Sequence, residues 1–406
     1  MSRAAVVLKL SLRNLFRNRR HSLYALATIT IASMGLLVFM GFNRGTMDEY
    51  RENTIRARWG HGQLYMRGYR GKAHERPWEN WIESPQETIE KLRALPGVRE
   101  LFPRVTIPAM VAAGGKAVAG QGEGIDGVAE ARFFTRMNYV EGGDLNDQPF
   151  AIVLGIGLAQ GLGVHVNDEV ELVARAGNTA LHSAKLTVGG IFQTGVQDFD
   201  SYAFRIPLKL AQQLLETERV ETISVALSGV RAWPEFAGAA NTLLPDLEAV
   251  PFDELDKVYY RHAVDWLDAQ FAFIEDIVLL MVFFGIFNAI SMTVMERTAE
   301  IGTLRAHGDS RMEIALGQVI EAAGLALLGG CLGILGGWLL SIGPLSHGIQ
   351  MPPAPGLTRG LRITIELARD EALRVLGLAV VTSAAGSVLP VWRAMHIPIV
   401  EALRHV

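Results

Sequence analysis

The sequence contains few of the residues from which disulfides, cysteine metal sites and nucleic-acid surfaces are built. Its 406 residues include a single cysteine, Cys331, so neither a disulfide framework nor a cysteine-based metal site can form within the chain. The formal net charge is −4, and the Lys and Arg residues do not form the basic stripe that a polyanion requires. These absences argue against cysteine redox chemistry and against nucleic acid as a partner.

The common catalytic and metal-binding motifs are also missing. No G-x-S-x-G is present, and the segments "YRGKAHE" and "GGKAV" lack the Ser or Thr that a P-loop places directly after its Lys. Asp198 and Asp200 are not followed by a calcium-loop pattern and predict turn chemistry. Four histidines occur without ligand spacing and are interpreted as surface or satisfied core residues: His61, His165, His182 and His262. We therefore predict no catalytic residue, no metal ligand and no cofactor in this chain.

Apolar sequence, in contrast, is abundant. Half of the residues are hydrophobic, only 20% are charged and 42 are glycine, which is typical of a membrane protein. A membrane-spanning helix needs about 20 mainly apolar residues. Four segments meet this requirement: 22–43, 270–295, 314–342 and 372–392. In the second segment, Glu275 and Asp276 lie within the first two turns, so we expect its apolar core at 277–295.

The distribution of basic residues predicts how these spans cross the membrane. Lys and Arg crowd residues 1–21 and recur in the 296–313 connection and in the tail at 393–406. Because positively charged connections stay in the cytoplasm, both termini and the 296–313 connection are predicted to be cytoplasmic. The 44–269 segment and the short 343–371 loop are then predicted to lie outside. Residues 1–21 fit an amphipathic helix in the inner membrane interface, and they also fit a basic topology signal with no further role.

The 44–269 segment is long enough for its own core and predicts an α+β domain. Short alternating runs, "GQLYM", "DEVELVA", "AKLTVGGIF" and "ETISVAL", indicate strands. Two runs with apolar residues three or four apart indicate helices, "SPQETIEKLRAL" and "IPLKLAQQLLETE". In the first of these, Ser84 and Glu87 have the spacing of a capping box. The predicted fold class is thus a four-span helical membrane protein with a large α+β domain inserted between the first and second spans.

The charged connection "ERTAEIGTLRAHGDSRMEI" lies between the second and third spans. Glu296 and Glu300 are four residues apart, Ile301 lies three and four residues before Leu304 and Arg305, and Gly308 follows as a stop signal. This spacing predicts a short helix at the cytoplasmic surface, which would convert a push from a cytoplasmic partner into movement of two spans. A solvated turn that only maintains the topology is the alternative.

The same residues carry a family resemblance. The segment "VMERTAEIGTLRAHGDSRMEI" resembles the coupling helix of the FtsX-like or macrolide-exporter-like permeases of ABC transporters. The matching positions are Glu296, Arg297, Glu300, Ile301, Gly302, Leu304, Arg305, Ala306 and Gly308. The C-terminal "LPVWRAMHIPIVEALRHV" is similar to the ending of that family. The segments "LSLRNLFRNRRHSLYAL", "GHGQLYMRGY" and "LPGVRELFPRV" resemble its lipoprotein-releasing branch.

This resemblance implies a permease in the inner membrane of a bacterium, with its large domain in the periplasm. Such a permease pairs with a second permease chain, identical or related, and with separate ATPase subunits that bind ATP and Mg²⁺. ATP binding moves the coupling helices and shifts the external domains, a process called mechanotransmission, and the residues implied in coupling are those of the 296–308 match. A lipoprotein or another amphiphile is the implied substrate, and membrane lipid and a periplasmic partner are further implied contacts.

Two alternatives to lipoprotein release remain open at this point. One is a division-type regulator that activates a periplasmic cell-wall hydrolase, and the other is a permease that exports drugs or peptides. In the lipoprotein-releasing branch, one permease recruits its periplasmic carrier through an extended hairpin. The corresponding stretch here, "ARAGNTALHSAK", is short, which argues against direct recruitment of a carrier by this chain.

The third span carries two further features. Gly329, Gly333 and Gly337 recur every four residues, which predicts a face for close helix packing, with a moving helix contact as the sharper alternative. Glu321 is the main ionisable residue within the spans, and such residues usually face the bundle interior. An interfacial position near the cytoplasmic end is the other interpretation of Glu321.

Overall fold

A computed structural model describes residues 19–72, 77–145, 148–176, 180–194, 196–296, 298–308, 310–352, 360 and 362–398. The chain divides into two compact units. The membrane unit comprises Met1–Asp48, Asp265–Gln350 and Arg362–Val406, and the inserted domain comprises Glu49–Val264 and Met351–Leu361. Within the predicted interfacial helix 1–21, residues 1–18 lie outside the described part, and residues 19–21 begin the first long helix.

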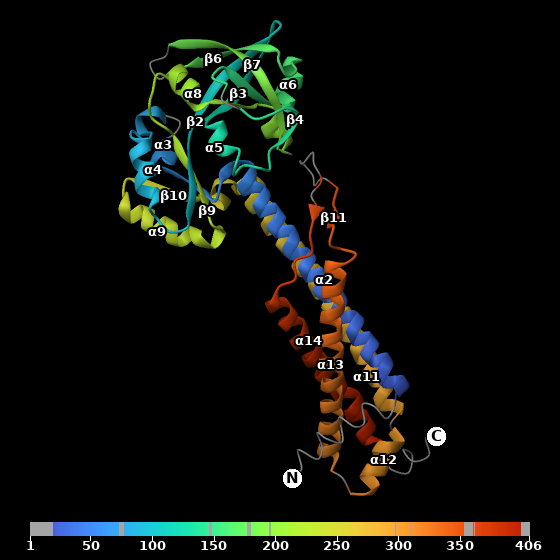
Figure 1. The fold of residues 1–406 in the computed structure, drawn as a ribbon. Helices are drawn as coiled ribbons and strands as arrows, with labels where there is room; N and C mark the ends of the chain where they lie inside the picture. Colours follow the sequence, from blue (N-terminus) through green and yellow to red (C-terminus); the bar gives the residue numbers. More distant parts are fainter. Residues whose placement is uncertain are drawn as a thin grey trace. The chain divides into compact units, whose positions relative to one another are not determined.

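In the described part of the membrane unit there are five helices (Figure 1): α2 (Arg19–Thr54), α11 (His262–Glu296), α12 (Thr298–Ala306), α13 (Arg311–Ile342) and α14 (Arg369–His396). Among the described residues, four helices are long and apolar enough to cross a membrane: α2, α11, α13 and α14. The four predicted spans lie within them. The helices α2 and α11 extend past the predicted limits because backbone hydrogen bonding continues through polar residues, whereas hydropathy marks only the apolar part.

The segment that joins α13 to α14 forms a two-stranded antiparallel ribbon of β11 (Ile349–Gln350) and β12 (Arg362–Ile363). The side chains of Ile363 and Ile365 are buried. We call residues 362–367 the strap, because their backbone crosses α2 at Gly41 and Gly45. Within the predicted loop 343–371, the strap therefore lies against the first span.

The inserted domain has a sheet lobe and a barrel lobe. The sheet lobe contains β10 (Leu247–Pro251), β1 (Gly62–Met66), β9 (Thr222–Leu227) and the first half of β2 (Val98–Ala113), in that order. Its core includes Leu64, Ile223 and Phe236. The accompanying short elements are η1 (Ile55–Trp59), α3 (Tyr69–Lys72), η2 (Pro77–Asn80), α4 (Pro85–Arg93), η3 (Val230–Ala232), α9 (Trp233–Leu243), α10 (Phe252–Leu255) and η4 (Lys257–Arg261).

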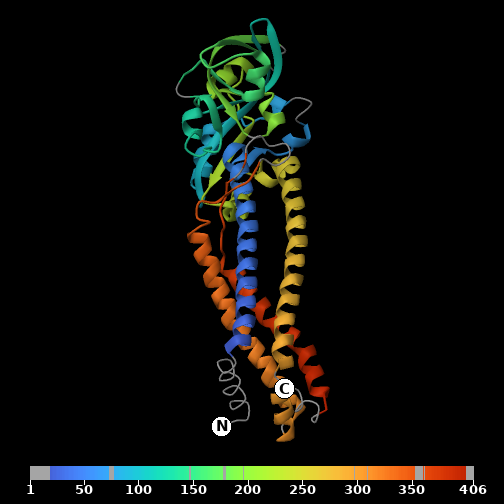
Figure 2. The same ribbon diagram turned by 90° about the vertical axis from the view of Figure 1, so that its right-hand side faces the viewer.

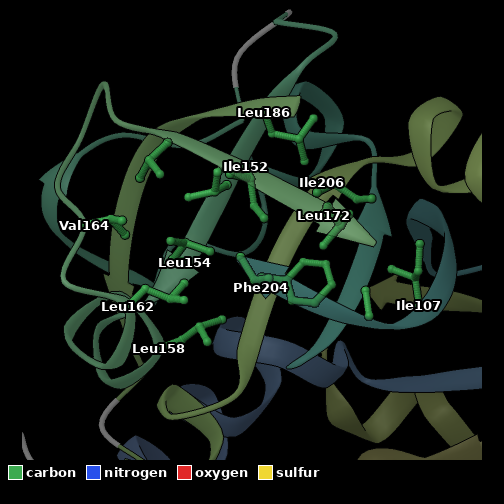
Figure 3. Packing of buried hydrophobic residues seen from close by; sticks show 14 of the residues in the cluster. Ile107, Ile152, Leu154, Leu158, Leu162, Val164, Leu172, Leu186, Phe204 and Ile206 are labelled. Atoms are coloured by element: carbon green, nitrogen blue, oxygen red, sulfur yellow. The ribbon is translucent and has the colours of Figure 1, made fainter. Parts of the chain in front are cut away.

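Six strands close the barrel lobe into a ring within the described residues. The order around the ring is β2, β3 (Lys116–Ile125), β8 (Ala203–Pro207), β5 (Ala151–Gly155), β7 (Leu181–Gln193) and β6 (Glu169–Arg175), and β6 pairs with β2 again. Phe204, Ile152 and Leu172 lie in its apolar interior (Figure 3). The remaining elements are α5 (Gly127–Glu130), β4 (Asn138–Gly142), α6 (Ile156–Leu162), α7 (Gln197–Asp200) and α8 (Leu208–Leu215).

The predicted fold class is confirmed, with one local correction. The four predicted strand segments coincide with β1, β6, β7 and β9, and the two helical segments coincide with α4 and α8. The capping box of α4 is wrong: Ser84 occupies the N-cap position but makes no side-chain capping bond. The carboxylate of Glu87 instead accepts a hydrogen bond from Lys91, 2.7 Å away and one turn later, so it is not available to Ser84.

Candidate functional site

The candidate coupling element is α12, which connects α11 to α13 at one end of the bundle beside the end of α14 (Figures 1 and 2). The 296–313 connection contains α12 and the start of α13, and the predicted stop at Gly308 separates the two helices. Gly308 has a φ of 96°, a conformation that favours glycine, and it ends the first helix. Ser310 and Glu313 form a capping box that starts α13. The break fixes α12 as a separate short element.

The helix α12 has a buried face and an exposed face. Thr298, Ile301 and Gly302 are buried, and Ile301 belongs to the same apolar cluster as Ile314 of α13 and Val391 of α14. On the other face, the side chains of Glu300, Thr303, Leu304 and His307 are exposed. An apolar face therefore seats α12 on the ends of its neighbours, and the opposite face is exposed.

Arg305 holds α12 to a distant part of the chain. Its guanidinium Nη1 donates a hydrogen bond of 2.6 Å to the carbonyl oxygen of Ile397, just past the end of α14. The last carbonyls of a helix have no partner within the helix, and a cation there is favourable. Arg305 is thus oriented inward, toward α14, whereas Glu300 is exposed. Arg297 lies outside the described residues, as does the side chain of Glu296.

The glycines of α13 lie where α13 crosses α2. A Cβ added at Gly329 would lie 2.9 Å from the Ile29 side chain, and one added at Gly333 would lie 2.7 Å from both the Ser33 side chain and the Thr30 carbonyl oxygen. Added at Gly337, it would lie 3.1 Å from Leu37. Only a glycine face permits this approach of the two backbones.

Sequence reasoning missed a second set of contacts made by glycine. A Cβ added at Gly330 would lie 2.8 Å from Leu376 of α14, so the paired glycines of α13 serve two neighbours. On α2, Gly41 and Gly45 admit the strap, and the Glu366 N–H donates to the Gly41 carbonyl oxygen at 3.1 Å. The four-residue spacing of these two glycines in "GFNRG" was the available signal.

An ion pair also joins α2 to the first turn of α14. Arg44 Nε lies 2.6 Å from Glu371 Oε1, and Arg44 Nη2 lies 3.2 Å from Asp370 Oδ2. Glu371 is buried, so this contact of α2 with the first turn of α14 is shielded from water on one side. Glu321 is also buried, beside Ala322 and Leu325 of the bundle core.

Two of the residues considered as catalytic or metal-binding, His61 and Asp200, have structural partners. His61 is buried, its Nδ1 accepts a hydrogen bond from the Leu227 N–H at 3.1 Å, and burial lowers the pKa of His61 to about 4. Asp200 is buried and accepts hydrogen bonds from the N–H and hydroxyl of Thr194, which is the predicted turn chemistry. Across the described ranges, no group of three or more His, Cys, Asp or Glu residues could hold a metal ion.

Two protein families match this chain and together cover most of it. The family described as FtsX-like permease C-terminal matches residues 276–399, which contain α12, α13 and α14. The MacB-like periplasmic core domain matches residues 22–243, more than half of the chain. The order of the two matches follows the order of the first span, the inserted domain and the remaining spans.

Individual relatives match over shorter lengths. The lipoprotein-releasing system transmembrane protein LolC of Neisseria meningitidis serogroup B is 26% identical over 210 residues, which is 48% of this chain and 49% of LolC. The chain therefore spans about half the length of that relative. The macrolide export ATP-binding/permease protein MacB of Chlorobium luteolum is 45% identical over 53 residues, which is 13% of this chain and 8% of that protein.

Solved structures of an extracellular domain and of a periplasmic region are also similar to part of this chain. The periplasmic region of MacB from Actinobacillus actinomycetemcomitans covers 50% of this chain and 94% of its own length at 13% identity, with a TM-score of 0.36. The extracellular domain of the noncanonic ABC-type transporter YknZ from Gram-positive bacteria covers 47% and 98%, at 12% identity and a TM-score of 0.33. On the strength of the family matches, the chain belongs to the FtsX-like, MacB-like permeases of ABC transporters, as a multi-pass membrane subunit.

Proposed function

We propose that this chain is a mechanotransmission permease, which couples ATP hydrolysis by a separate ATPase to the extraction or export of an amphiphilic substrate. The observation that supports this proposal is that α12 has one buried face and one exposed face. Its apolar face is buried against α13 and α14, Arg305 ties it to the Ile397 carbonyl oxygen, and its exposed face carries Glu300. A helix that is fixed on one side and exposed on the other can transmit a push from a partner.

In this proposal, α12 and both termini face the cytoplasm and the inserted domain faces the periplasm of a bacterial inner membrane. The basic residues of the N-terminal segment and of the 296–313 connection support this orientation. The ATPase subunits would dock on the exposed face of α12 and bind the ATP and Mg²⁺, and a second permease chain would complete the membrane assembly.

Lipoprotein release from the membrane is the cargo class that we favour. The 26% identity with LolC supports it. The hairpin between β6 and β7 is short, since Arg175 already pairs with Leu181, so we assign recruitment of any periplasmic carrier to another chain. Export of a drug or peptide and activation of a cell-wall hydrolase are the competing outcomes of the test below.

The first test is gentle affinity purification of the full chain from its native membrane, followed by mass spectrometry. A stoichiometric P-loop ATPase is expected, together with a second permease and bound lipoprotein. A bound hydrolase in place of lipoprotein would indicate the regulatory function instead. Absence of any ATPase, under conditions that preserve other membrane complexes, would overturn the proposed function.

The second test separates the two faces of α12 in the purified complex. Glu300→Gln is expected to reduce ATPase docking or stimulation at least tenfold, because it changes the exposed face. Arg305→Met is expected to leave the ATPase bound but uncouple ATP hydrolysis from substrate release, because it loosens the inner anchor. Thr303→Val is the matched control on the same exposed face, where the Thr303 hydroxyl only donates to the Ala299 carbonyl oxygen. Unchanged substrate release by both Glu300→Gln and Arg305→Met would refute the assignment of α12.

A further inference from the structure

Five charged side chains meet inside the inserted domain. They are Arg58 of η1, Arg104 of β2, Glu123 of β3, Glu130 of α5 and Arg205 of β8. Arg104, Glu130 and Arg205 are each at most 3% exposed, and Glu123 is 16% exposed. Burying charges in this way costs free energy unless each charge is paired and hydrogen-bonded. Solvation at the protein surface therefore does not account for these charges, and a structural role has to explain why they are buried.

Arg104 lies at the centre of this network. Its Nε and Nη2 donate to the two carboxylate oxygens of Glu130 at 2.7 and 2.8 Å, and its Nη1 donates to the Arg58 carbonyl oxygen at 2.6 Å. The bidentate pairing of a guanidinium with a carboxylate fixes both distance and orientation. Arg104 also lies over the Phe134 ring, 4.4 Å from its centroid. The single side chain thus fixes three elements to one another.

Glu123 joins the remaining members. Its Oε2 accepts a hydrogen bond from Arg205 at 3.2 Å, and its Oε1 lies 3.6 Å from Arg58 Nε. Burial alone would raise the pKa of Glu123, but the guanidinium groups of Arg104, Arg205 and Arg58 lower it to about 2. Glu123 is therefore ionised at every physiological pH.

The network sits where β2 passes from one lobe to the other. Residues from Val98 to Arg104 pair with β9 of the sheet lobe, and residues from Val105 to Ala113 pair with β3 of the barrel lobe. Arg104 is the last residue of the first set. Glu123 and Arg205 belong to adjacent barrel strands, because β3 and β8 pair in parallel. The charged cluster thus lies at the junction of the two lobes.

The first span helix reaches the same junction. The helix α2 ends at Thr54 and continues directly as the π-helical turn η1, which contains Arg58. Arg58 lies over the rings of Trp59 and Phe199, 4.3 and 4.1 Å from their centroids. π-helical turns are rare and are frequently found at functional sites. The backbone of this turn is the acceptor for Arg104.

We propose that the network of Arg58, Arg104, Glu123, Glu130 and Arg205 is a rigid joint, which fixes the end of the first span helix to the junction of the sheet and barrel lobes. A displacement of the helix end then moves both lobes as one body, instead of bending the domain at β2. This inference concerns the inserted domain alone and does not depend on the identity of the cargo or of the ATPase.

The test uses the full chain in lipid nanodiscs, with Cys331 replaced by Ala and spin labels at Leu181→Cys and Leu243→Cys. These two positions are exposed and lie on the barrel lobe and the sheet lobe, respectively. The joint is removed by Arg104→Met together with Glu130→Leu, so that no lone charge stays buried. The matched control removes an exposed pair within one helix, Glu87→Leu with Lys91→Met.

Two measurements report on the joint. Pulsed electron spin resonance gives the distribution of distances between the lobes, and hydrogen exchange of residues 52–62 reports on η1. In the joint variant, we expect a broader distance distribution and at least tenfold faster exchange in η1, with both unchanged in the control. An unchanged distribution and unchanged exchange would overturn the proposal. If the joint variant does not fold, the same two measurements on Arg104→Lys decide, because a lysine keeps the charge but cannot reproduce the bidentate pairing with Glu130 together with the bond to the Arg58 carbonyl oxygen; the expected and refuting results are the same.

Discussion

Substitution of Gly45 by alanine tests how closely the strap lies on α2. A Cβ at Gly45 would overlap the carbonyl oxygen of Thr364 and would lie 3.0 Å from the Thr364 carbonyl carbon. Ordinary van der Waals contact begins at 3.4 Å, and the obstacle is backbone, which cannot rotate away as a side chain can. The strap must therefore move off α2, and we expect Gly45→Ala to release it.

The expected cost follows from the contacts that would be lost. The strap is held by the hydrogen bond from the Glu366 N–H to Gly41 and by one from the Ser341 hydroxyl to the Ile365 carbonyl oxygen at 3.2 Å. A hydrogen bond contributes about 1 kcal/mol net, so losing both costs about 2 kcal/mol. Because 1.4 kcal/mol corresponds to a factor of ten, the Glu366 amide should exchange with solvent ~30-fold faster.

Hydrogen exchange and mass spectrometry of the full chain in nanodiscs would measure this change in the peptide that contains residues 362–372. The control is Gly35→Ala, the same substitution in the same helix at a position with nothing within 4 Å of an added Cβ. Equal exchange at Glu366 in both variants would show that the strap does not rest on α2 at Gly45. Faster exchange in both variants would point to a general loosening of α2.

Two further predictions concern other parts of the molecule. Gly333→Leu should greatly lower the yield of folded, monodisperse protein in size-exclusion chromatography, because a leucine cannot fit between α13 and α2, whereas Gly377→Leu, at a position with open space, should not. Burial holds the pKa of His61 at about 4, below its ordinary value of 6.5. The contribution of the neutral His61 to the free energy of unfolding is therefore complete above pH 6.5 and is lost as the pH drops from 6.5 toward 4. Thermal unfolding should show a smaller loss between pH 7 and pH 4.5 in His61→Asn, which keeps an acceptor for the Leu227 N–H; an identical loss would mean that other groups set the pH dependence.

Features that depend on local pattern could be predicted from the sequence. The apolar spans, the short alternating strands and the glycine spacing in α13 each leave a signal within about 20 residues. The segment around Glu300 and Arg305 can be recognised as a short helix for the same reason, because its signal is also local. The helix stop at Gly308 was predicted, and the start of α13 could also have been predicted, because Ser310 and Glu313 form a capping box.

Features that depend on distant pairing could not be predicted in this way. The barrel closes because β6 pairs with β2, which precedes it by about 60 residues. Neither strand has a sequence pattern that identifies the other as its partner. The joint residues Arg104 and Glu130 look like ordinary surface charges in the sequence, since only the fold brings them together and removes them from water. The inward orientation of Arg305 was likewise hidden, because its acceptor lies 92 residues later.

The contacts of the membrane unit form a closed chain that begins and ends at the connection between α11 and α13. Arg305 ties α12 to the end of α14, and Glu371 at the start of α14 binds Arg44 of α2. The glycine face around Gly333 presses α2 against α13, which follows α12 directly in sequence. For α12 to move separately, α2, α13 and α14 would have to lose backbone contacts or the half-buried ion pair of Arg44 with Glu371. A displacement of α12 therefore cannot stay confined to that helix. Packed interfaces of this kind shift as whole bodies instead of deforming gradually. In the proposed function, a displacement of α12 would therefore reach α2, which continues in sequence into η1.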